Sequence, residues 1–332
     1  MAEDTVVRWG ILGASRFACE QMGPAIHSAQ GAALAGLATS SAEKAAPFQR
    51  FAPGLTLFDS YEALLASPDI DAVYIPLPNQ LHVEWTLKAL EAGKPVLTEK
   101  PLAMKAPEFD AVIEARDKTG LLAAEAYMIV HHPQWQRARE LVQGGAIGQL
   151  QHVDGFFSYD NSADADNIRN RPETGGGSIP DIGVYTMGSV RFVTGEEPTK
   201  VAAEITWENG VDVTAHVTAS FPSFRFQATT SMRMHPRQEM TFHGSDGIVR
   251  LTAPYNTNVF GQAEVHLQRN AHRPGQNPEV TIERWPGVNQ YAIQVENFGR
   301  AMRGEINYPC PLEFSRETQA MIDEVFRAAG NS

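Results

Sequence analysis

Short apolar runs alternate with amphipathic stretches along the first part of the chain. Runs of this length, bounded by Gly, Pro or polar residues, are typical of buried strands, and the stretches between them carry the spacing of helices. The predicted strands are Val6–Leu12, Ala32–Ala38, Leu55–Phe58, Ala72–Ile75, Pro95–Thr98 and Leu121–Tyr127. Helices are expected to end near Ser28, to begin near Ala42, and to cover 81–92 and 106–119. This alternation predicts a doubly wound parallel sheet with crossover helices.

The pattern changes after residue 127. A helical stretch at 133–143 ends at Gly144-Gly145, and short β-rich segments follow, separated by Gly, Pro, Asn and Asp. These segments, which predict one large antiparallel sheet, are 149–159, 201–207, 211–221, 225–234, 239–243, 248–252, 264–268 and 279–284. Helices at 289–302 and 315–329 end the chain. The expected organisation is an α/β Rossmann domain over 1–127 and an α+β domain over 128–332 with an open-faced, mainly antiparallel sheet, for substrate binding and oligomerisation.

One further helix is expected in the middle of the chain, after Gly175-Gly176-Gly177. Ser178 is a good N-cap, and Pro180 suits the first turn, where its missing N–H is not needed. Asp181 and Tyr185 are four residues apart, so their side chains are expected on one face, near an N-terminus that favours anions. The pattern predicts a carboxylate and a phenol presented together.

Length, charge and cysteine content limit the possible functions. With 332 residues and 43% apolar content, the chain fits two domains of common size. A net charge of -12 without a Lys/Arg cluster excludes a nucleic-acid partner. Two cysteines favour a reducing compartment, the cytoplasm, and the histidines, including His131-His132, lack metal spacing, so no metal is expected. No leader pattern and no apolar run of about 18 residues occurs, so no membrane association is expected.

The turn after the first strand is a candidate dinucleotide site. Gly13–Ala18 is a variant of the G-x-G-x-x-G/A fingerprint, at the strand-to-helix turn where the fingerprint must lie. Ser15 replaces the middle glycine, so that its Cβ crowds the pyrophosphate or its hydroxyl donates to it. A generic turn of small residues is the alternative. The expected cofactor contacts in this turn are Gly13, Ala14, Ser15, Arg16 and Phe17.

The end of the second strand bears on the choice of cofactor. NAD-selective sites usually carry Asp or Glu there, about 20 residues past the glycines, to bind the ribose 2′-OH. Here Thr39, Ser40 and Ser41 follow the strand, with Lys44 beyond. Hydroxyls and an ammonium group suit a 2′-phosphate, so NADP(H) is predicted in preference to NAD(H), which stays possible. A helix N-cap followed by a solvated face is the alternative.

Two more loops follow strands at their carboxyl ends, the edge where ligands bind in open α/β sheets. Pro76, Asn79 and His82 come after the fourth strand, and contact with the cofactor is expected there, although a cap for Asn79 and a packed position for His82 are the better-favoured alternatives. Glu99, also a predicted cofactor contact, and Lys100 precede Pro101, and a cis bond there would fix the direction of the lysine. Lys100 is expected to bind the cofactor and to donate to a substrate oxygen, unless the loop is a solvated turn.

These motifs together resemble the glucose-fructose oxidoreductase/inositol dehydrogenase (Gfo/Idh/MocA) family over nearly the whole chain. The resemblance lies in Gly10–Ala18, Glu99-Lys100-Pro101, Gly175–Tyr185, Arg191 and Gly195–Pro198. Tyr185, where many members have histidine, is most similar to the branch with dimeric dihydrodiol dehydrogenase and NADP-linked xylose dehydrogenases. The resemblance implies an active site in the cleft between the two domains. It also implies that Lys100 binds the reacting oxygen and lowers the pKa of the phenol, Tyr185 is the general acid/base, and Asp181 holds a substrate hydroxyl.

The expected function is therefore NADP(H)-dependent hydride transfer to or from a carbinol or carbonyl carbon of a sugar, polyol or dihydrodiol. Two alternatives are a non-catalytic NADP- or sugar-sensing regulator and a sugar–sugar oxidoreductase that retains its cofactor tightly. Arg169 and Asn170, in the loop before the glycines, are candidate substrate ligands or part of a solvated loop. A sheet with one face uncovered predicts a homodimer or homotetramer through that face.

Overall fold

The structure is a computed structural model that describes residues 6–270 and 277–330. The chain divides into two compact units. Unit 1 contains the residues up to His131 and, later in the chain, Asn289–Arg316, whereas unit 2 contains His132–Val288 and the residues from Glu317 onward. Unit 1 is therefore built from two separate stretches of sequence.

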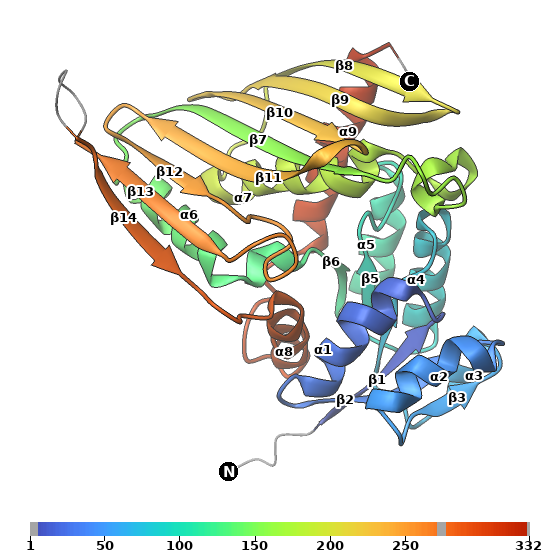
Figure 1. The fold of residues 1–332 in the computed structure, drawn as a ribbon. Helices are drawn as coiled ribbons and strands as arrows, with labels where there is room; N and C mark the ends of the chain where they lie inside the picture. Colours follow the sequence, from blue (N-terminus) through green and yellow to red (C-terminus); the bar gives the residue numbers. More distant parts are fainter. Residues whose placement is uncertain (1–5, 271–276, 331–332) are drawn as a thin grey trace. The chain divides into compact units, whose positions relative to one another are not determined.

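Unit 1 contains the predicted doubly wound parallel sheet (Figure 1). Its six strands lie in the order β3-β2-β1-β4-β5-β6, and all their pairings are parallel. The order reverses between β1 and β4, which are neighbours although two strands separate them in sequence. The strands are β1 Val7–Leu12, β2 Ala32–Ala38, β3 Thr56–Phe58, β4 Ala72–Ile75, β5 Val96–Glu99 and β6 Ala123–Ala126.

Helices cover both faces of this sheet. Successive strand residues point to opposite faces, and both faces are apolar, so each face packs against its own set of helices. One face packs around Trp9, whose ring centroid lies 5.0 Å from that of Phe298, and the other packs around Leu64, Trp85 and Phe109. The helical segments are η1 Ala18–Met22, α1 Gly23–Ser28, α2 Ala42–Phe51, α3 Tyr61–Ala66, η2 Asn79–Leu81, α4 His82–Glu91, α5 Glu108–Thr119, η3 Met128–His131 and α8 Gln290–Met302. The fold predicted for this part of the chain is confirmed.

Unit 2 contains an eight-stranded sheet in the order β14-β13-β12-β11-β7-β10-β9-β8. Its strands are β7 Leu150–Asp160, β8 Lys200–Glu208, β9 Val211–Ser220, β10 Arg225–Ser231, β11 Arg233–Gly244, β12 Gly247–Leu251, β13 Glu264–Arg269 and β14 Glu279–Arg284. The sheet is mainly antiparallel, as predicted, but β7 and β10 pair in parallel. The expectation of an antiparallel sheet fails only for this pair. After β10 the chain passes around the end of β7 at Met232, so that β10 and β11 lie on opposite sides of β7.

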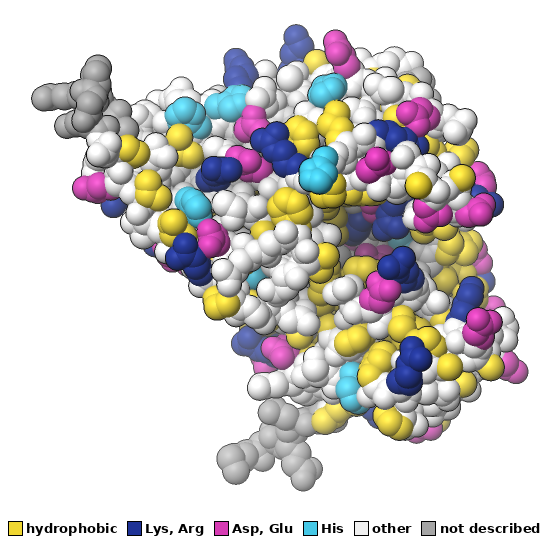
Figure 2. Space-filling view, in the orientation of Figure 1, with side chains coloured by type: hydrophobic (Ala, Val, Ile, Leu, Met, Phe, Trp, Pro, Cys, Tyr) yellow, Lys and Arg dark blue, Asp and Glu magenta, His cyan; other side chains and the backbone are white. Residues whose placement is uncertain are grey.

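The two faces of this sheet differ. Helices α6 Pro133–Gln143 and α7 Val184–Thr194 lie against one face (Figure 1). Exposed polar side chains alternate on the other, where Figure 2 shows basic, acidic and histidine side chains interspersed. Unit 2 also contains η4 Ile168–Asn170, η5 Pro172–Thr174 and η6 Ile179–Gly183, and helix α9 Leu312–Ala328 belongs to it from Glu317 onward.

Arg191 of α7 is buried and fixes the end of that helix. Its guanidinium contacts both carboxylate oxygens of Glu197 at 2.6 Å and donates to the Thr318 hydroxyl at 2.5 Å. The Arg191 and Gly195–Pro198 part of the sequence motif thus joins α7 to α9 within unit 2. None of the helices in the described part of the chain is long and apolar enough to cross a membrane.

Candidate active site

The predicted cofactor residues lie at one edge of the unit 1 sheet. They follow the carboxyl ends of β2, β1, β4 and β5, which are neighbours in that order. Parallel strands end at the same edge, and the reversal between β1 and β4 is the switch point where such sheets bind dinucleotides. The structure therefore gathers the four loops that the sequence nominated separately.

The glycine turn fits a pyrophosphate-binding loop. Gly13 has φ +92°, and a Cβ at this residue would lie 3.0 Å from Leu77 Cδ2 and 3.3 Å from the Tyr61 hydroxyl. The positive φ favours glycine, and a larger residue would also press against these two side chains. The Ser15 hydroxyl accepts the N–H of Ala18 at 3.1 Å, so it closes the first turn of the helical segment that follows. A helix start next to a strand end is a favourable place for phosphate groups.

The loop after β2 combines a helix cap with a possible phosphate site. Ser41 caps α2, since its hydroxyl accepts the N–H of Lys44 at 3.2 Å, and the Thr39 hydroxyl accepts the N–H of Ser41 at 3.2 Å. The alternative role of a cap is therefore confirmed for Ser41. A hydroxyl that accepts one bond can still donate its proton. Together with the exposed Lys44, this set of donors suits a 2′-phosphate.

His82 connects the loops that follow β4 and β5. Its side chain is buried, with Nδ1 2.8 Å from the Pro101 carbonyl and Nε2 2.7 Å from the Leu77 carbonyl. Burial lowers the pKa of this imidazole. Asn79 lies in the 3-10 helix before α4, whose own N-cap position, Leu81, has no side-chain bond, and a cap by Asn79 stays a prediction.

Three anchors hold the loop that carries Lys100. The hydroxyl of Tyr74 donates to Glu99 Oε1 at 2.6 Å, and the N–H of Leu102 donates to Glu125 Oε2 at 2.8 Å. His82 supplies the third anchor at the Pro101 carbonyl. The Lys100–Pro101 peptide bond is cis, the geometry that the sequence suggested. The backbone on both sides of Lys100 is thus fixed within unit 1.

Glu125 makes the stability of unit 1 depend on pH. Its carboxyl group is 3% exposed, and burial raises its pKa from 4.5 to about 7. The group therefore contributes stability that is complete below pH 4.5 and is lost as the pH rises through 7. In wild type this part of the free energy of unfolding is expected to fall by about 2 kcal/mol between pH 5 and pH 8.

The variant Glu125→Gln keeps an acceptor for the Leu102 N–H but does not titrate. Urea unfolding at pH 5 and pH 8 is expected to show a smaller loss of stability in this variant than in wild type. Equal losses in the two proteins would contradict the assignment of the titration to Glu125.

The helix that carries Asp181 and Tyr185 begins differently from the prediction. Residues 179–183 form a π-helical turn, η6, before α7 begins at Val184. Ser178 occupies the N-cap position, as predicted, but its side chain does not cap the helix: the residue has helical backbone angles, and its hydroxyl donates to Asp212 Oδ2 at 2.8 Å instead. Such π turns are frequent at functional sites.

Asp181 is held by two side chains from other elements of unit 2. Its Oδ2 lies 2.8 Å from Arg169 Nε and accepts the Tyr159 hydroxyl proton at 2.7 Å. The charge of Asp181 raises the pKa of the Arg169 guanidinium. Burial, and then the Asp181 charge, raise the pKa of the Tyr159 phenol, which stays a proton donor. The structure thus joins Arg169 to Asp181, which the sequence nominated independently.

The Arg169 side chain is 40% exposed, whereas that of Asp181 is 13% exposed. Part of the Arg169 side chain therefore remains exposed beside the nearly buried carboxylate. Asn170 holds the loop together: its amide donates to the carbonyls of Asn161 and Asp164, and its oxygen accepts from Arg233. A substrate contact by Asn170 stays a prediction.

Tyr185 lies among aromatic rings. It is 6% exposed, and its ring centroid is 5.8 Å from Phe157 and 5.7 Å from Tyr255, which stack on each other at 4.9 Å. These two rings and Tyr159 were not among the residues predicted from the sequence. Phe157 and Tyr159 lie at the end of a predicted strand, just before the polar loop, and this position could have marked them as site residues. Tyr255 lies in a loop, where no sequence pattern indicates a role in the site.

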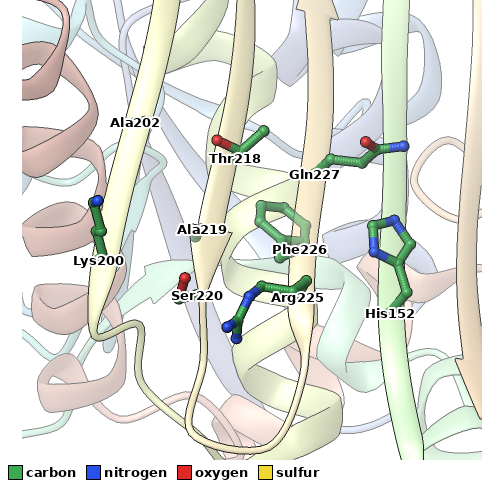
Figure 3. Close-up of a pocket in the computed structure, with 9 residues that line it drawn as sticks. All are labelled: His152, Lys200, Ala202, Thr218, Ala219, Ser220, Arg225, Phe226 and Gln227. Carbon is green, nitrogen blue, oxygen red and sulfur yellow. The ribbon is translucent and has the colours of Figure 1, made fainter.

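A shallow hollow of about 360 Å³ lies on the exposed face of the unit 2 sheet (Figure 3). Its polar lining comes from β7, β8, β9 and β10 and includes His152, Lys200, Arg225 and Gln227, above the ring of Phe226. Helix α7 lies against the opposite face, so the hollow is separate from Asp181 and Tyr185. No cluster of three or more metal-ligating residues occurs within 6–270 and 277–330.

Comparison with known proteins agrees with this architecture. Residues 7–127 match an oxidoreductase family with an NAD-binding Rossmann fold, and residues 135–250 match the GFO/IDH/MocA C-terminal domain. The protein is thus an oxidoreductase with a dinucleotide-binding Rossmann domain. It belongs to the Gfo/Idh/MocA family, as the resemblance implied.

Individual relatives cover almost the whole chain. The uncharacterized oxidoreductase ORF334 of Rhizobium meliloti is 35% identical over 98% of this chain and 97% of its own. D-xylose 1-dehydrogenase (NADP(+)) 2 of Haloferax volcanii is 31% identical over 97% of each chain. The crystal structure of KijD10, a 3-ketoreductase from Actinomadura kijaniata in complex with NADP and TDP-benzene, superposes with a TM-score of 0.87 at 27% identity over 98% of each chain.

Proposed function

We propose that this protein is a cytoplasmic, NADP(H)-dependent oxidoreductase that acts on a carbinol or carbonyl carbon of a sugar, polyol or dihydrodiol. The observation that carries the proposal is the Asp181 carboxylate, held by Arg169 and Tyr159 at the start of the helix that presents Tyr185. A module that only binds a ligand has no need of this acid–base pair. Relatives named as xylose dehydrogenase and 3-ketoreductase support the substrate class.

Tyr185 is the proton donor and acceptor in this proposal. Its hydroxyl gives a proton to the reacting oxygen in reduction and takes it back in oxidation, while the nicotinamide supplies or accepts the hydride. A free phenol has a pKa of about 10, so it needs positive charge nearby to act at neutral pH. Lys100 provides one ammonium group, and Arg169 provides a guanidinium whose pKa is itself raised partly by the charge of Tyr185.

Lys100 binds the reacting oxygen, and Asp181 holds a neighbouring substrate hydroxyl by accepting its hydrogen bond. Arg169 compensates the charge of Asp181, which otherwise opposes ionisation of the phenol. KijD10 has been crystallised as variants in which a lysine or a tyrosine is replaced, the two residue types assigned here to the reacting oxygen. The roles proposed for Lys100, Asp181 and Tyr185 are supported by the chemistry of these residues within each unit and by membership of the family.

Absorbance at 340 nm tests the function directly. The purified protein is incubated with NADP⁺ or NADPH and a panel of aldoses, polyols, keto sugars and dihydrodiols, and turnover is expected with at least one class. Tight cofactor binding without turnover of any compound would favour a sensor. Cofactor that survives gel filtration, with turnover only when two sugars are present, would favour a sugar–sugar oxidoreductase.

Cofactor preference gives a second test. NADP(H) is expected to bind at least about tenfold more tightly than NAD(H), because one charge-assisted bond to the 2′-phosphate contributes about 1.5 to 3 kcal/mol. Lys44→Glu is expected to lose most of this preference while NAD(H) affinity changes little. The matched control is Glu43→Lys, one residue earlier on α2, which adds charge without removing Lys44. Equal affinity of wild type for the two cofactors would contradict the assignment.

We also propose that the exposed face of the unit 2 sheet associates with a second copy of the chain. Charges of both signs alternate there, as in the Arg237–Glu239 and Arg250–Glu239 pairs, so the face does not repel itself. Light scattering at micromolar concentration is expected to give a dimer or tetramer. Thr218→Arg, which adds a cation beside Lys200 and Arg225, is expected to weaken it. A wild-type monomer would contradict this proposal.

A further inference from the structure

A carboxylate from a neighbouring strand holds the start of the helix that carries Asp181 and Tyr185. Asp212 of β9 is 1% exposed, and its Oδ2 accepts the N–H of Ile179 at 2.6 Å and the Ser178 hydroxyl proton at 2.8 Å. No side chain of the helix itself caps this end. Asp212 therefore takes the place of an N-cap from 34 residues further along the chain.

The approach of the two segments is unusually close. Gly177 has φ +128°, and a Cβ at this residue would lie 2.0 Å from Asp212 Oδ1. Glycine is thus required by its backbone angle and by the carboxylate. Because glycines have no side chains to pack, the segment before η6 is held in place by its polar contacts. Asp212 bonds both to Ile179, the first residue of η6, and to Ser178 directly before it.

Burying a carboxylate is costly, which indicates a specific use for Asp212. Burial raises its pKa to about 7, and the bonds from Ile179 and Ser178 act against that rise. A charge at a helix start is favoured by the helix dipole, but an apolar side chain would avoid the cost of burial. The two short bonds are therefore better explained by precise placement of the helix than by stability.

We propose that Asp212 is a positioning residue that sets the orientation of Asp181 and Tyr185 by fixing the first turn of η6. The inference rests on the proposed function, because Asp212 acts through those two side chains. Misplacing a catalytic group by about 1 Å can cost on the order of 100-fold in rate. The effect on turnover is therefore expected to exceed the effect on substrate binding.

Steady-state kinetics of Asp212→Asn and Asp212→Leu test the proposal. Both bonds go to one oxygen, so the Asn amide oxygen can accept both, and kcat is expected to stay within about threefold of wild type. Leu has the same branched side-chain skeleton, with bulkier methyl groups and no acceptor, and its kcat is expected to fall on the order of 10- to 100-fold, with a smaller change in KM. In a Tyr185→Phe background the same Leu change is expected to cost clearly less than in wild type, because one of the two groups that Asp212 positions is gone.

Thr214→Val is the matched control. Thr214 is also a buried polar residue of β9, but its hydroxyl bonds to Ser231 and not to η6. The control is expected to keep kcat within about twofold of wild type even if it unfolds at a lower temperature. A Leu variant with wild-type kcat, or one whose full loss persists in the Tyr185→Phe background, would overturn the positioning role while leaving the proposed function intact.

Hydrogen–deuterium exchange separates the two hypotheses if wild type turns over none of the panel. That result overturns the function. The amides of 177–187 are then expected to exchange at least about tenfold faster in Asp212→Leu than in wild type and Thr214→Val, through freer local opening. Unchanged exchange would overturn the inference about Asp212.

Discussion

Replacing Tyr185 by Phe is expected to lower kcat by on the order of 100-fold or more, while the Kd for the cofactor stays within about twofold of wild type. The change removes one oxygen and keeps the ring, so the packing against Phe157 and Tyr255 is retained. The proton of the reacting oxygen then has no donor or acceptor on α7. Steady-state rates and cofactor titration on the same preparations measure the two quantities.

Tyr308→Phe serves as the control for loss of a phenol hydroxyl away from the site. Tyr308 is partly buried against the core of unit 1, where its ring packs on Phe298 at 5.7 Å, and its hydroxyl accepts from Gln294. Its kcat is expected to stay close to that of wild type. Near-native turnover by Tyr185→Phe would remove Tyr185 from the chemistry.

Replacing Lys100 by Met is expected to lower kcat/KM by on the order of 100-fold or more, since a charge that stabilises the reacting oxygen is lost. The loop around Lys100 is held by Glu99, His82 and Glu125 through contacts that do not use the lysine ammonium. Met has nearly the same length as the lysine stem, so the fold is expected to persist. Circular dichroism and cofactor titration check this.

Two features distinguish this effect from a general loss of positive charge. Lys105→Met removes an exposed lysine five residues further on and is expected to leave kcat/KM unchanged. The Lys100 variant is also expected to shift the alkaline limb of the pH–rate profile upward, because in the proposed mechanism the lysine ammonium lowers the pKa of the phenol. A profile and rate that match wild type would exclude Lys100 from the site.

The sequence predicts most of the fold because its apolar runs end at Gly, Pro or polar residues. The predicted limits of β2, β4, β14 and α6 are those in the structure. Strand pairing is less accessible, since the parallel pair β7–β10 depends on the chain passing around one strand end at Met232. No local pattern records which strands become neighbours across such a distance.

In the site, too, residues within one segment could be predicted from the sequence, whereas contacts between distant segments could not. Asp181 and Tyr185 are recognisable because they share one helix and one family motif. The predicted capping bond from the Ser178 side chain does not form, because Asp212 accepts the backbone N–H of Ile179 instead. Asp212 lies in a strand whose residues 211–215 are all buried, and a single Asp in such a strand does not indicate a capping role. The pairing of Arg169 with Asp181 likewise needs the tertiary structure, although each residue was nominated from its own segment.

The division of unit 1 into two stretches constrains how the protein folds during its synthesis. All six strands of its sheet are complete by Ala126, yet the Trp9 face is covered in part by Val295 and Phe298 of α8. A nascent chain that ends before α8 therefore leaves part of the apolar surface around Trp9 uncovered. Because the strands of unit 2 are synthesised before α8, the Trp9 face of unit 1 is completed only after them.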